Sequence, residues 1–191
     1  MLATLIELQR LKRLDRTGWT LRGLPNGTES VAAHSFGVSV AAMLLADKIT
    51  ARGKAIDCEK VMRMALLHDL AETRIGDMPK TAVSYFGSEA RRKAEIAAFA
   101  DVIAATGNAR DHYQDLYEEY EARESLEARV VKAADVIDLL VQAWALERGG
   151  ARGLEEFWEV ATSDFALEGA ASEVVKEIVA QLLAAREPLP R

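Results

Sequence analysis

The sequence is short of cysteine, of long apolar runs and of net positive charge. Its one cysteine, Cys58, excludes an internal disulfide framework and suits a reducing cytoplasm, where we expect the protein to act. No apolar stretch approaches the roughly 18–20 residues that span a bilayer, so no membrane partner is expected. The first ten residues are amphipathic and lack a small-residue cleavage pattern, so we expect no signal peptide.

Acidic residues outnumber basic ones. The chain carries 24 Lys and Arg against 30 Asp and Glu, a formal net charge of −6. This balance disfavours a large nucleic-acid footprint and an anionic membrane surface as partners. Half of the 191 residues are apolar and 28% are charged. Such a chain is typical of one soluble globular domain that buries about two thirds of its surface.

Strict alternation of apolar and polar residues is also absent, and helical spacing dominates the chain. We expect helices over about 2–14, 30–52, 57–75, 88–107, 110–122, 125–149, 151–162 and 170–186. Ser30, Asp57, Ser88 and Ser125 are suitable N-caps. Glycines and a proline within 15–30 predict a loop, and Pro79 predicts a turn. With no repeat or linker, residues 1–191 are expected to form a single all-α domain.

One helical segment contains an unusual pair of polar residues. His68 and Asp69 interrupt an otherwise apolar run, Glu72 follows one turn later, and Asp77 stands just past the segment's end. Burying such groups without partners costs about 2–7 kcal/mol, so something must compensate them. If the helix is continuous, Glu72 shares the face of the pair. A carboxylate there could hold or deprotonate water without binding a metal.

Two further polar residues complete a candidate metal site. His34 and Asp135 each lie in another apolar helical segment. Two imidazoles and two carboxylates, drawn from three helices, form a ligand set that suits a divalent metal ion. The sequence therefore predicts a metal site between the central helices.

Each residue also has an ordinary structural explanation. A buried histidine is more often a hydrogen-bonded core residue than a ligand. Asp69 could pair with an arginine such as Arg74, and Glu72 alone is most often a surface residue. Asp135 could be a solvated position, and Asp138 on the same face competes for the ligand role. Their joint occurrence favours the metal site, because each ordinary explanation would have to hold independently.

These residues carry a family resemblance. His34, the His68-Asp69 pair and Asp135 resemble the H…HD…D signature of the HD-domain metal-dependent phosphohydrolases. The likeness is to the YfbR and HDDC2-like branch, the 5′-deoxynucleotidases, over about residues 5–147. The matching segments are Arg-Thr-Gly-Trp (16–19), Glu-Ser-Val-Ala-Ala-His-Ser (29–35), His-Asp-Leu-Ala-Glu (68–72), Ile-Gly-Asp-Met-Pro (75–79), Leu-Tyr-Glu-Glu-Tyr-Glu (116–121) and Val-Lys-Ala-Ala-Asp (131–135). The C-terminal helices, 151–186, would complete or flank the HD-domain helical bundle.

The resemblance implies a metal centre and a catalytic pair. His34, His68, Asp69 and Asp135 would bind one divalent ion. Cobalt or manganese is the usual ion of this branch, and zinc, nickel or iron also suits the ligands. Asp69 and Glu72 would be catalytic, with Glu72 orienting or deprotonating the attacking water.

The resemblance also implies substrate contacts. Arg16, within a local basic cluster, would hold the terminal phosphate, since a guanidinium offers two parallel hydrogen bonds. Trp19 would pack against the sugar and disfavour a 2′-hydroxyl, although a tryptophan is more often a core residue. Asp77 would contact the 3′-hydroxyl of the deoxyribose, and Lys80 would assist the phosphate.

The implied activity is hydrolysis of deoxyribonucleoside 5′-monophosphates by metal-activated water, in a protein expected to be a homodimer. One alternative is an HD phosphohydrolase acting on another nucleotide phosphate ester. A second is a regulatory protein that binds a nucleotide without chemistry. A di-iron HD oxygenase would need further histidines between the pair and the last aspartate, where the sequence offers only His112.

Overall fold

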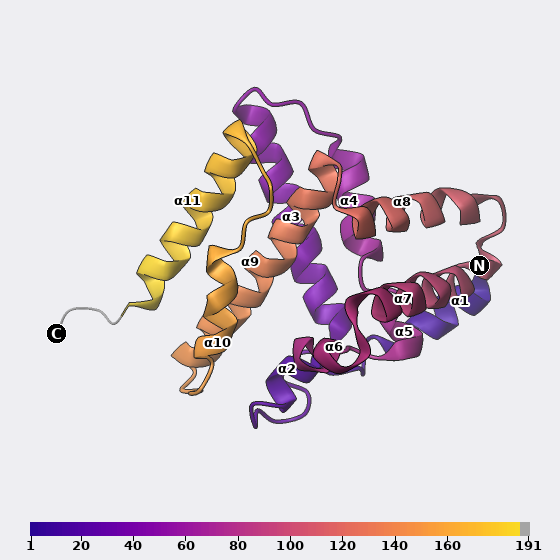
Figure 1. Ribbon diagram of the computed structural model, residues 1–191, viewed down its shortest axis with the longest axis horizontal. Helices are drawn as coiled ribbons and strands as arrows, with labels where there is room; N and C mark the ends of the chain where they lie inside the picture. The colour runs from indigo at the N-terminus through magenta and orange to yellow at the C-terminus, as the bar shows by residue number, and fades with distance from the viewer. Residues whose placement is uncertain (188–191) are drawn as a thin grey trace.

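The computed structural model describes residues 1–187, and the chain's last four residues lie outside the described part (Figure 1). Within the described part every regular element is a helix, which confirms the all-α prediction. The α-helices are Leu2–Glu7 (α1), Thr17–Thr20 (α2), Val31–Ala51 (α3), Cys58–Leu67 (α4), Glu72–Ile75 (α5), Lys80–Phe86 (α6), Ser88–Val102 (α7), Arg110–Ala122 (α8), Leu126–Arg148 (α9), Glu155–Trp158 (α10) and Gly169–Arg186 (α11). Short 3₁₀ turns cover Leu8–Arg10, Ala104–Ala109 and Glu159–Thr162.

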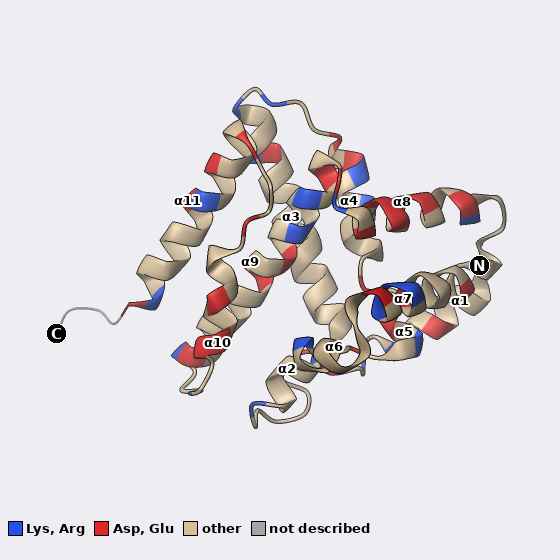
Figure 2. Ribbon diagram, in the orientation of Figure 1, with Lys and Arg blue, Asp and Glu red and all other residues tan. Residues whose placement is uncertain are grey.

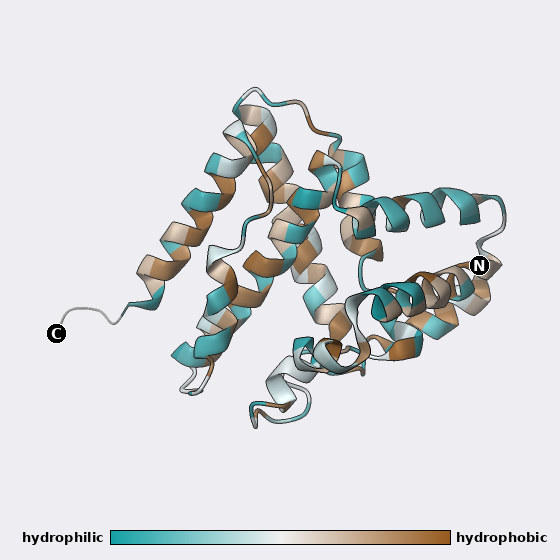
Figure 3. Ribbon diagram, in the orientation of Figure 1, coloured by the Kyte–Doolittle hydropathy of each residue, from teal (hydrophilic) through white to brown (hydrophobic). Residues whose placement is uncertain are grey.

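Helices α3, α4 and α9 form the centre of the molecule. α3 and α9 pack along one another, and α4 packs against both. α11 covers α3 and α9 on one side, and α8 and α7 lie on the other (Figure 1). α8 is largely hydrophilic, whereas α3 and α9 carry many apolar positions (Figure 3). Buried alanines of α9, such as Ala133 and Ala134, let the neighbouring helices approach closely.

Local sequence fixes where the central helices begin. Ser30, Asp57 and Ser125 cap α3, α4 and α9, and each side chain accepts a hydrogen bond from a backbone N–H three residues later. These three predicted caps are confirmed. The predicted cap Ser88 is wrong, because Gly87 occupies the N-cap position and Ser88 is the first helical residue of α7.

The predicted helix over 57–75 is interrupted where the His68-Asp69 pair stands. α4 ends at Leu67 and α5 begins at Glu72. Between them, the amides of Leu70 and Glu72 donate to carbonyls three residues earlier, each over 3.1 Å. These tight turns replace the four-residue spacing of an α-helix. Glu72 is therefore brought to the pair by a turn and not by one continuous helical face.

Two segments expected to be irregular contain short helices. α2 lies within the predicted loop 15–30, and α6 begins directly after Pro79. Both are too short to show an apolar periodicity in the sequence. Each nevertheless supplies walls to the cavity described below.

α3 meets the requirements for a membrane-crossing helix by length and composition alone. The prediction that no apolar stretch approaches this length is therefore wrong. The finding is a weak indication, because the core helices of soluble proteins pass the same test. α3 is such a core helix here, with Val38, Ala42 and Ile49 fully buried.

Candidate metal centre

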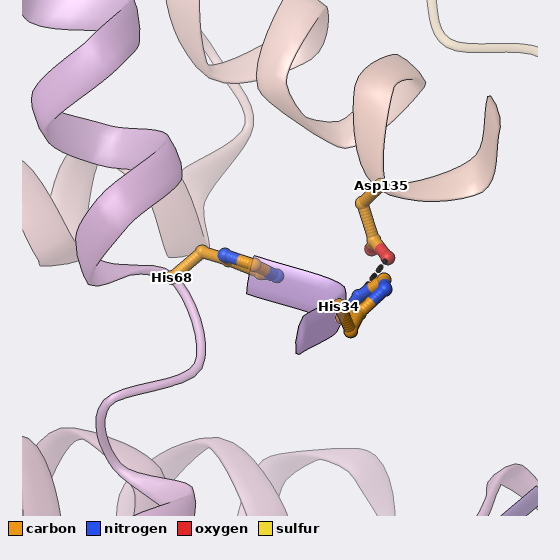
Figure 4. Close-up of side chains that lie close together, drawn as sticks. All are labelled: His34, His68 and Asp135. Carbon is orange, nitrogen blue, oxygen red and sulfur yellow. Dashed lines mark ion pairs between the residues drawn. The ribbon is translucent and has the colours of Figure 1, made fainter. Parts of the chain in front are cut away.

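Two histidine rings meet at the centre of the fold. His34 lies in the first turns of α3 and His68 directly follows α4, and their ring centroids are 5.6 Å apart. Asp135, from the middle of α9, points toward His34, with its Oδ1 3.2 Å from His34 Nε2 (Figure 4). One potential ligand atom from each of the three residues lies within 4.8 Å of the others. This spacing leaves room for a single ion between them.

Asp69 joins the same cluster. Its Oδ2 lies 3.2 Å from His68 Nε2 and 3.8 Å from His34 Nε2. The four residues predicted as ligands thus come together from α3, α9 and the turn between α4 and α5. Segments more than 100 residues apart in the sequence supply one site.

The outer nitrogen of each ring is already engaged. His68 Nδ1 lies 2.8 Å from the carbonyl oxygen of Ala65, and His34 Nδ1 lies 2.8 Å from Asp138 Oδ2. A carbonyl can only accept, so His68 Nδ1 carries the proton, and His34 Nδ1 donates in the same way to the carboxylate. Both Nε2 atoms then face the centre, where each could give its lone pair to a bound cation.

The residues present fit a divalent cation. Within residues 1–187, the Nε2 atoms of His34 and His68 are buried and make no hydrogen bond. A buried polar atom without a partner costs about 1–3 kcal/mol, so a ligand at this point would remove an unfavourable contribution. Burial lowers the pKa of His34, but the negative charge of the neighbouring Asp135 and Asp138 carboxylates outweighs it and raises the pKa to about 9. The site therefore attracts positive charge.

Asp138 does not compete with Asp135 for the place between the two histidine rings. Its carboxylate contacts the outer nitrogen of His34, where it fixes the ring's orientation. Gly37 makes this approach possible, because a Cβ at that position would lie 2.7 Å from Asp138 Cγ. Asp69 does pair with an arginine, but that residue is Arg16 and not Arg74, which contacts Glu7 and Asp101.

A cavity of about 580 Å³ opens beside the cluster. One part of its lining is charged, and another part is apolar and aromatic. The charged part includes Arg16, Asp69, Glu72, Asp77, Arg91 and Asp135, and the apolar part includes Trp19, Val136, Leu139, Phe157 and Val160. The cavity can therefore accept a ligand that is anionic at one end and apolar at the other.

Arg16 lies between two carboxylates at the charged end. Its NH1 atom is 3.2 Å from Asp69 Oδ2 and 4.0 Å from Asp77 Oδ1. Burial lowers the pKa of Arg16, but the surrounding carboxylates outweigh it, so the guanidinium stays charged. A cation next to the predicted ligand Asp69 is well placed to meet an anion bound at the metal centre.

Glu72 is buried on the same side of the cavity, and its Oε2 has no hydrogen-bond partner within residues 1–187. Burial, followed by repulsion from Asp69 and Asp77, raises the pKa of Glu72 above its usual range. A carboxyl group perturbed in this way beside a candidate cation site is a strong candidate for proton transfer.

The other predicted substrate-contact residues lie around this cavity. Trp19 is only 1% exposed, donates from its indole N–H to Glu29 over 2.5 Å and also forms part of the wall. Asp77 accepts a 2.5 Å hydrogen bond from the backbone N–H of Thr17, so it anchors the start of α2. This structural role was not predicted. Lys80 lies at the start of α6, exposed and lining the cavity.

Sequence reasoning missed several lining residues, among them Arg91 and Phe157. Arg91 of α7 stands in an ordinary charged stretch with no motif. Phe157 of α10 belongs to the C-terminal part of the chain, where no resemblance was found, and only its aromatic pair with Trp158 offered a signal. His112, the one histidine available for a second metal, is exposed on α8.

An all-helical bundle with this histidine and aspartate cluster is the fold and site expected of the HD-domain metal-dependent phosphohydrolases. The family model described as HD domain matches residues 8–174, and the chain belongs to that family. It is 33% identical over 152 residues to the 5′-deoxynucleotidase HDDC2 of Danio rerio, covering 78% of this chain and 72% of the relative. It is 35% identical over 144 residues to the 5′-deoxynucleotidase HDDC2 of Dictyostelium discoideum, covering 73% of each.

A solved structure shows the same fold. A conserved hypothetical protein from Pyrococcus furiosus superposes with a TM-score of 0.84 at 36% identity, covering 96% of this chain and 99% of that one. The family assignment and the resemblance to the 5′-deoxynucleotidases are thereby confirmed.

Proposed function

We propose that this protein is a metal-dependent 5′-deoxynucleotidase, which hydrolyses deoxyribonucleoside 5′-monophosphates to a deoxynucleoside and phosphate. The main observation that supports this proposal is the cluster of two unpartnered histidine nitrogens and two aspartates. This cluster opens onto a cavity that Arg16 and Glu72 also line. Relatives named 5′-deoxynucleotidase support the substrate class.

His34, His68, Asp69 and Asp135 would hold the divalent ion. When bound, the ion supplies a Lewis acid beside the phosphate and lowers the pKa of water at the site. We propose cobalt or manganese, although this ligand set also accepts zinc, nickel or iron. Elemental analysis of protein purified without added metal tests this choice, and a stoichiometric content of zinc would overturn it.

The chain's own residues position the phosphate and move the proton. Arg16 binds phosphate oxygens and offsets their negative charge. Glu72 takes a proton from the attacking water while the oxygen of that water forms a bond to phosphorus. The bond from phosphorus to O5′ breaks, its electron pair stays on O5′, and that oxygen takes up the proton that Glu72 received from the water.

Selection of the sugar would come from Trp19 on α2 and from Asp77, which anchors the start of that helix. Trp19 is fixed by its hydrogen bond to Glu29 and by packing against Phe157, with ring centroids 4.5 Å apart. A wall held in this way would disfavour a 2′-hydroxyl. Asp77, on the same cavity, would accept a hydrogen bond from the 3′-hydroxyl, and Lys80 would assist the phosphate.

Phosphate release from four nucleotides tests the function. Metal-loaded protein is incubated with dAMP, AMP, deoxyadenosine 3′-monophosphate and dATP. We expect release from dAMP, with the others slower by about tenfold or more, because a site built for one sugar and one phosphate position disfavours the rest. Equal release from AMP would remove the deoxyribose preference. Faster release from dATP or the 3′-monophosphate would favour another phosphate ester, and nucleotide binding without release from any would favour a regulatory protein.

We also propose that the protein is a cytoplasmic homodimer. α3 carries an exposed apolar stripe at helical spacing, which consists of Phe36, Val40, Met43 and Leu44. Such a stripe supports association with a second copy. The single cysteine supports a reducing compartment. Cell fractionation tests the location, and recovery in an oxidising compartment would overturn it.

A further inference from the structure

A second cavity of about 480 Å³ adjoins the catalytic one. The two cavities share Lys80, Lys132, Val136 and Val160 as wall residues. The remaining lining of the second cavity consists of Arg123, Arg129, Ser163, Asp164, Phe165 and Ala166. Four basic residues and one carboxylate thus surround a cavity in a chain whose net charge is −6. Two of the cavity's basic residues, Arg129 and Lys132, stand in the first half of α9, where Figure 2 shows blue segments.

Arg129 is held in place by neutral groups. Its Nε donates to the carbonyl of Arg123 over 2.9 Å, and its NH1 donates to the carbonyl of Ala166 over 3.0 Å. Within residues 1–187, no carboxylate oxygen lies within 4.0 Å of its guanidinium. Its orientation is therefore fixed while its charge is not neutralised by an ion pair.

Arg123 is fixed in a different way. It ends α8 in the left-handed conformation, with φ 58° and ψ 24°, a position where glycine is the common residue. Its guanidinium carbon lies 3.3 Å from the centroid of the Tyr120 ring, and its nearest carboxylate, Glu121, is 3.8 Å away. Stacking on the ring holds the guanidinium at the cavity, and the long ion pair with Glu121 offsets its charge only in part.

The two lysines differ in how far their charge is offset. Lys132 Nζ lies 2.7 Å from Asp135 Oδ2, which links the second cavity to a predicted metal ligand. Lys80 has no carboxylate within 4.0 Å among the described residues and is exposed. The cavity's one carboxylate, Asp164, accepts a hydrogen bond from the backbone N–H of Ala166 over 2.8 Å. Positive charge therefore exceeds negative charge around this cavity.

We propose that the second cavity binds a phosphate group, separate from the phosphate that lies at the metal centre. Two guanidinium groups with fixed orientations suit the oxygens of a phosphate dianion. That phosphate could be free inorganic phosphate, the product of the reaction, or a second phosphate on a nucleotide whose 5′-phosphate lies in the catalytic cavity. Only the second source rests on the proposed function, because binding of free phosphate requires no turnover.

Calorimetric titration of inorganic phosphate into metal-free protein tests the site. The Arg16→Gln variant removes the phosphate contact of the catalytic cavity, so its remaining binding reports the second cavity. Arg123→Gln and Arg129→Gln, each combined with Arg16→Gln, remove the proposed contacts. The matched control is Arg63→Gln in the same background, because Arg63 pairs only with Glu59 on the exposed face of α4 in the described structure.

We expect saturable binding in Arg16→Gln, unchanged binding with Arg63→Gln added, and affinity lower by about tenfold with either test substitution. Arg129→Gln also loses its contact with Ala166, so Arg123→Gln, which leaves that contact in place, keeps the result interpretable. No saturable binding in Arg16→Gln would overturn the proposal. So would equal affinity in the Arg123→Gln, Arg129→Gln and Arg63→Gln proteins.

A second titration identifies the source of the phosphate. Deoxyadenosine 5′-diphosphate and dAMP are compared in the metal-free wild-type and Arg123→Gln proteins, in which neither nucleotide is hydrolysed. An advantage of about tenfold for the diphosphate, lost in Arg123→Gln, supports a second phosphate on the nucleotide. Equal affinities for the two nucleotides, together with weaker binding of inorganic phosphate in the Arg123→Gln and Arg129→Gln variants of the first titration, support a site for free phosphate. Failure of the four-nucleotide assay would leave both titrations meaningful, because neither measures hydrolysis.

Discussion

At the scale of single residues, His34 is the most constrained side chain of the centre. Its Nε2 faces Asp135 and Asp69, while its Nδ1 is held by Asp138. The outer carboxylate sets the tautomer and ring angle, and the inner two are left for an ion. Position decides these roles, because the three carboxylates are chemically identical.

His68→Ala and Glu72→Gln separate metal binding from proton transfer. Loss of the His68 imidazole removes a ligand atom, so we expect the purified protein to lose its ion. Glu72→Gln keeps the size of a buried side chain but cannot take a proton, so the ion should stay while turnover falls by about 10²–10⁴. Elemental analysis and phosphate release from dAMP measure the two effects. Full turnover in Glu72→Gln would contradict its role.

Gly37→Ala tests the outer carboxylate. Alanine is the better helix former by about 1 kcal/mol, so on α3 alone the change should stabilise the protein. The added methyl group would instead fall within contact distance of Asp138 and displace it from His34. We expect metal affinity to drop by about 10- to 100-fold. Metal titration measures this, and Asp138→Asn should give a loss in the same direction. Unchanged affinity in both variants would show that Asp138 does not orient the ring.

At the scale of elements, α2 and α10 meet across the cavity. Gly18 of α2 leaves room for Phe157 of α10, since a Cβ there would lie 3.2 Å from the ring. Arg22 and Glu156 form an ion pair between the same two segments. α10, from the part of the chain without recognisable motifs, therefore completes the apolar side of the site.

Phe157→Leu tests this wall. The ring belongs to the apolar part of the cavity lining, whereas the charged part would hold the phosphate. We therefore expect Phe157 to contact the nucleobase. Leucine retains apolar character but lacks the flat face, and KM for dAMP should rise about 3- to 10-fold with kcat nearly unchanged. Steady-state kinetics measure the split. Phe86→Leu, at an exposed phenylalanine outside the cavity lining, is the matched control. A fall in kcat alone would place Phe157 in the chemistry instead of in binding.

At the scale of the whole molecule, α3 connects the interior with the surface. One face carries His34 and the buried core residues Val38 and Ala42, and another carries the exposed apolar stripe. A helix apolar on more than one face is typical of an element that packs on both sides. A second copy on the outer face would place α3 in the interior of a dimer.

Leu44→Glu tests the dimer. Leu44 is 57% exposed in the stripe, so the monomer fold should tolerate a glutamate, whereas an apolar interface would bury an unpaired charge. We expect light scattering to give twice the chain mass for the wild type and the single chain mass for the variant. Tyr85→Glu, at an exposed aromatic residue of α6, should leave the mass unchanged. A wild-type protein that is monomeric at about 100 μM would contradict the dimer.

The sequence by itself determined the helical class, three of the helix starts and the chemical types at the metal centre. These follow from local properties: apolar spacing, capping side chains such as Ser30 and Asp57, and two histidines set in apolar helices. Apolar spacing did not reveal the break after Leu67, because a tight turn and a helix place neighbouring residues on nearly the same face.

Only the tertiary structure decided which groups share a site. Asp135 and Asp138 stand on one face of one helix, and the packing of α3 against α9 alone distinguishes the inner from the outer carboxylate. The same holds for Phe157 and for the basic residues of the second cavity. Each owes its position to segments distant in sequence, and contact through space leaves no local pattern in the chain.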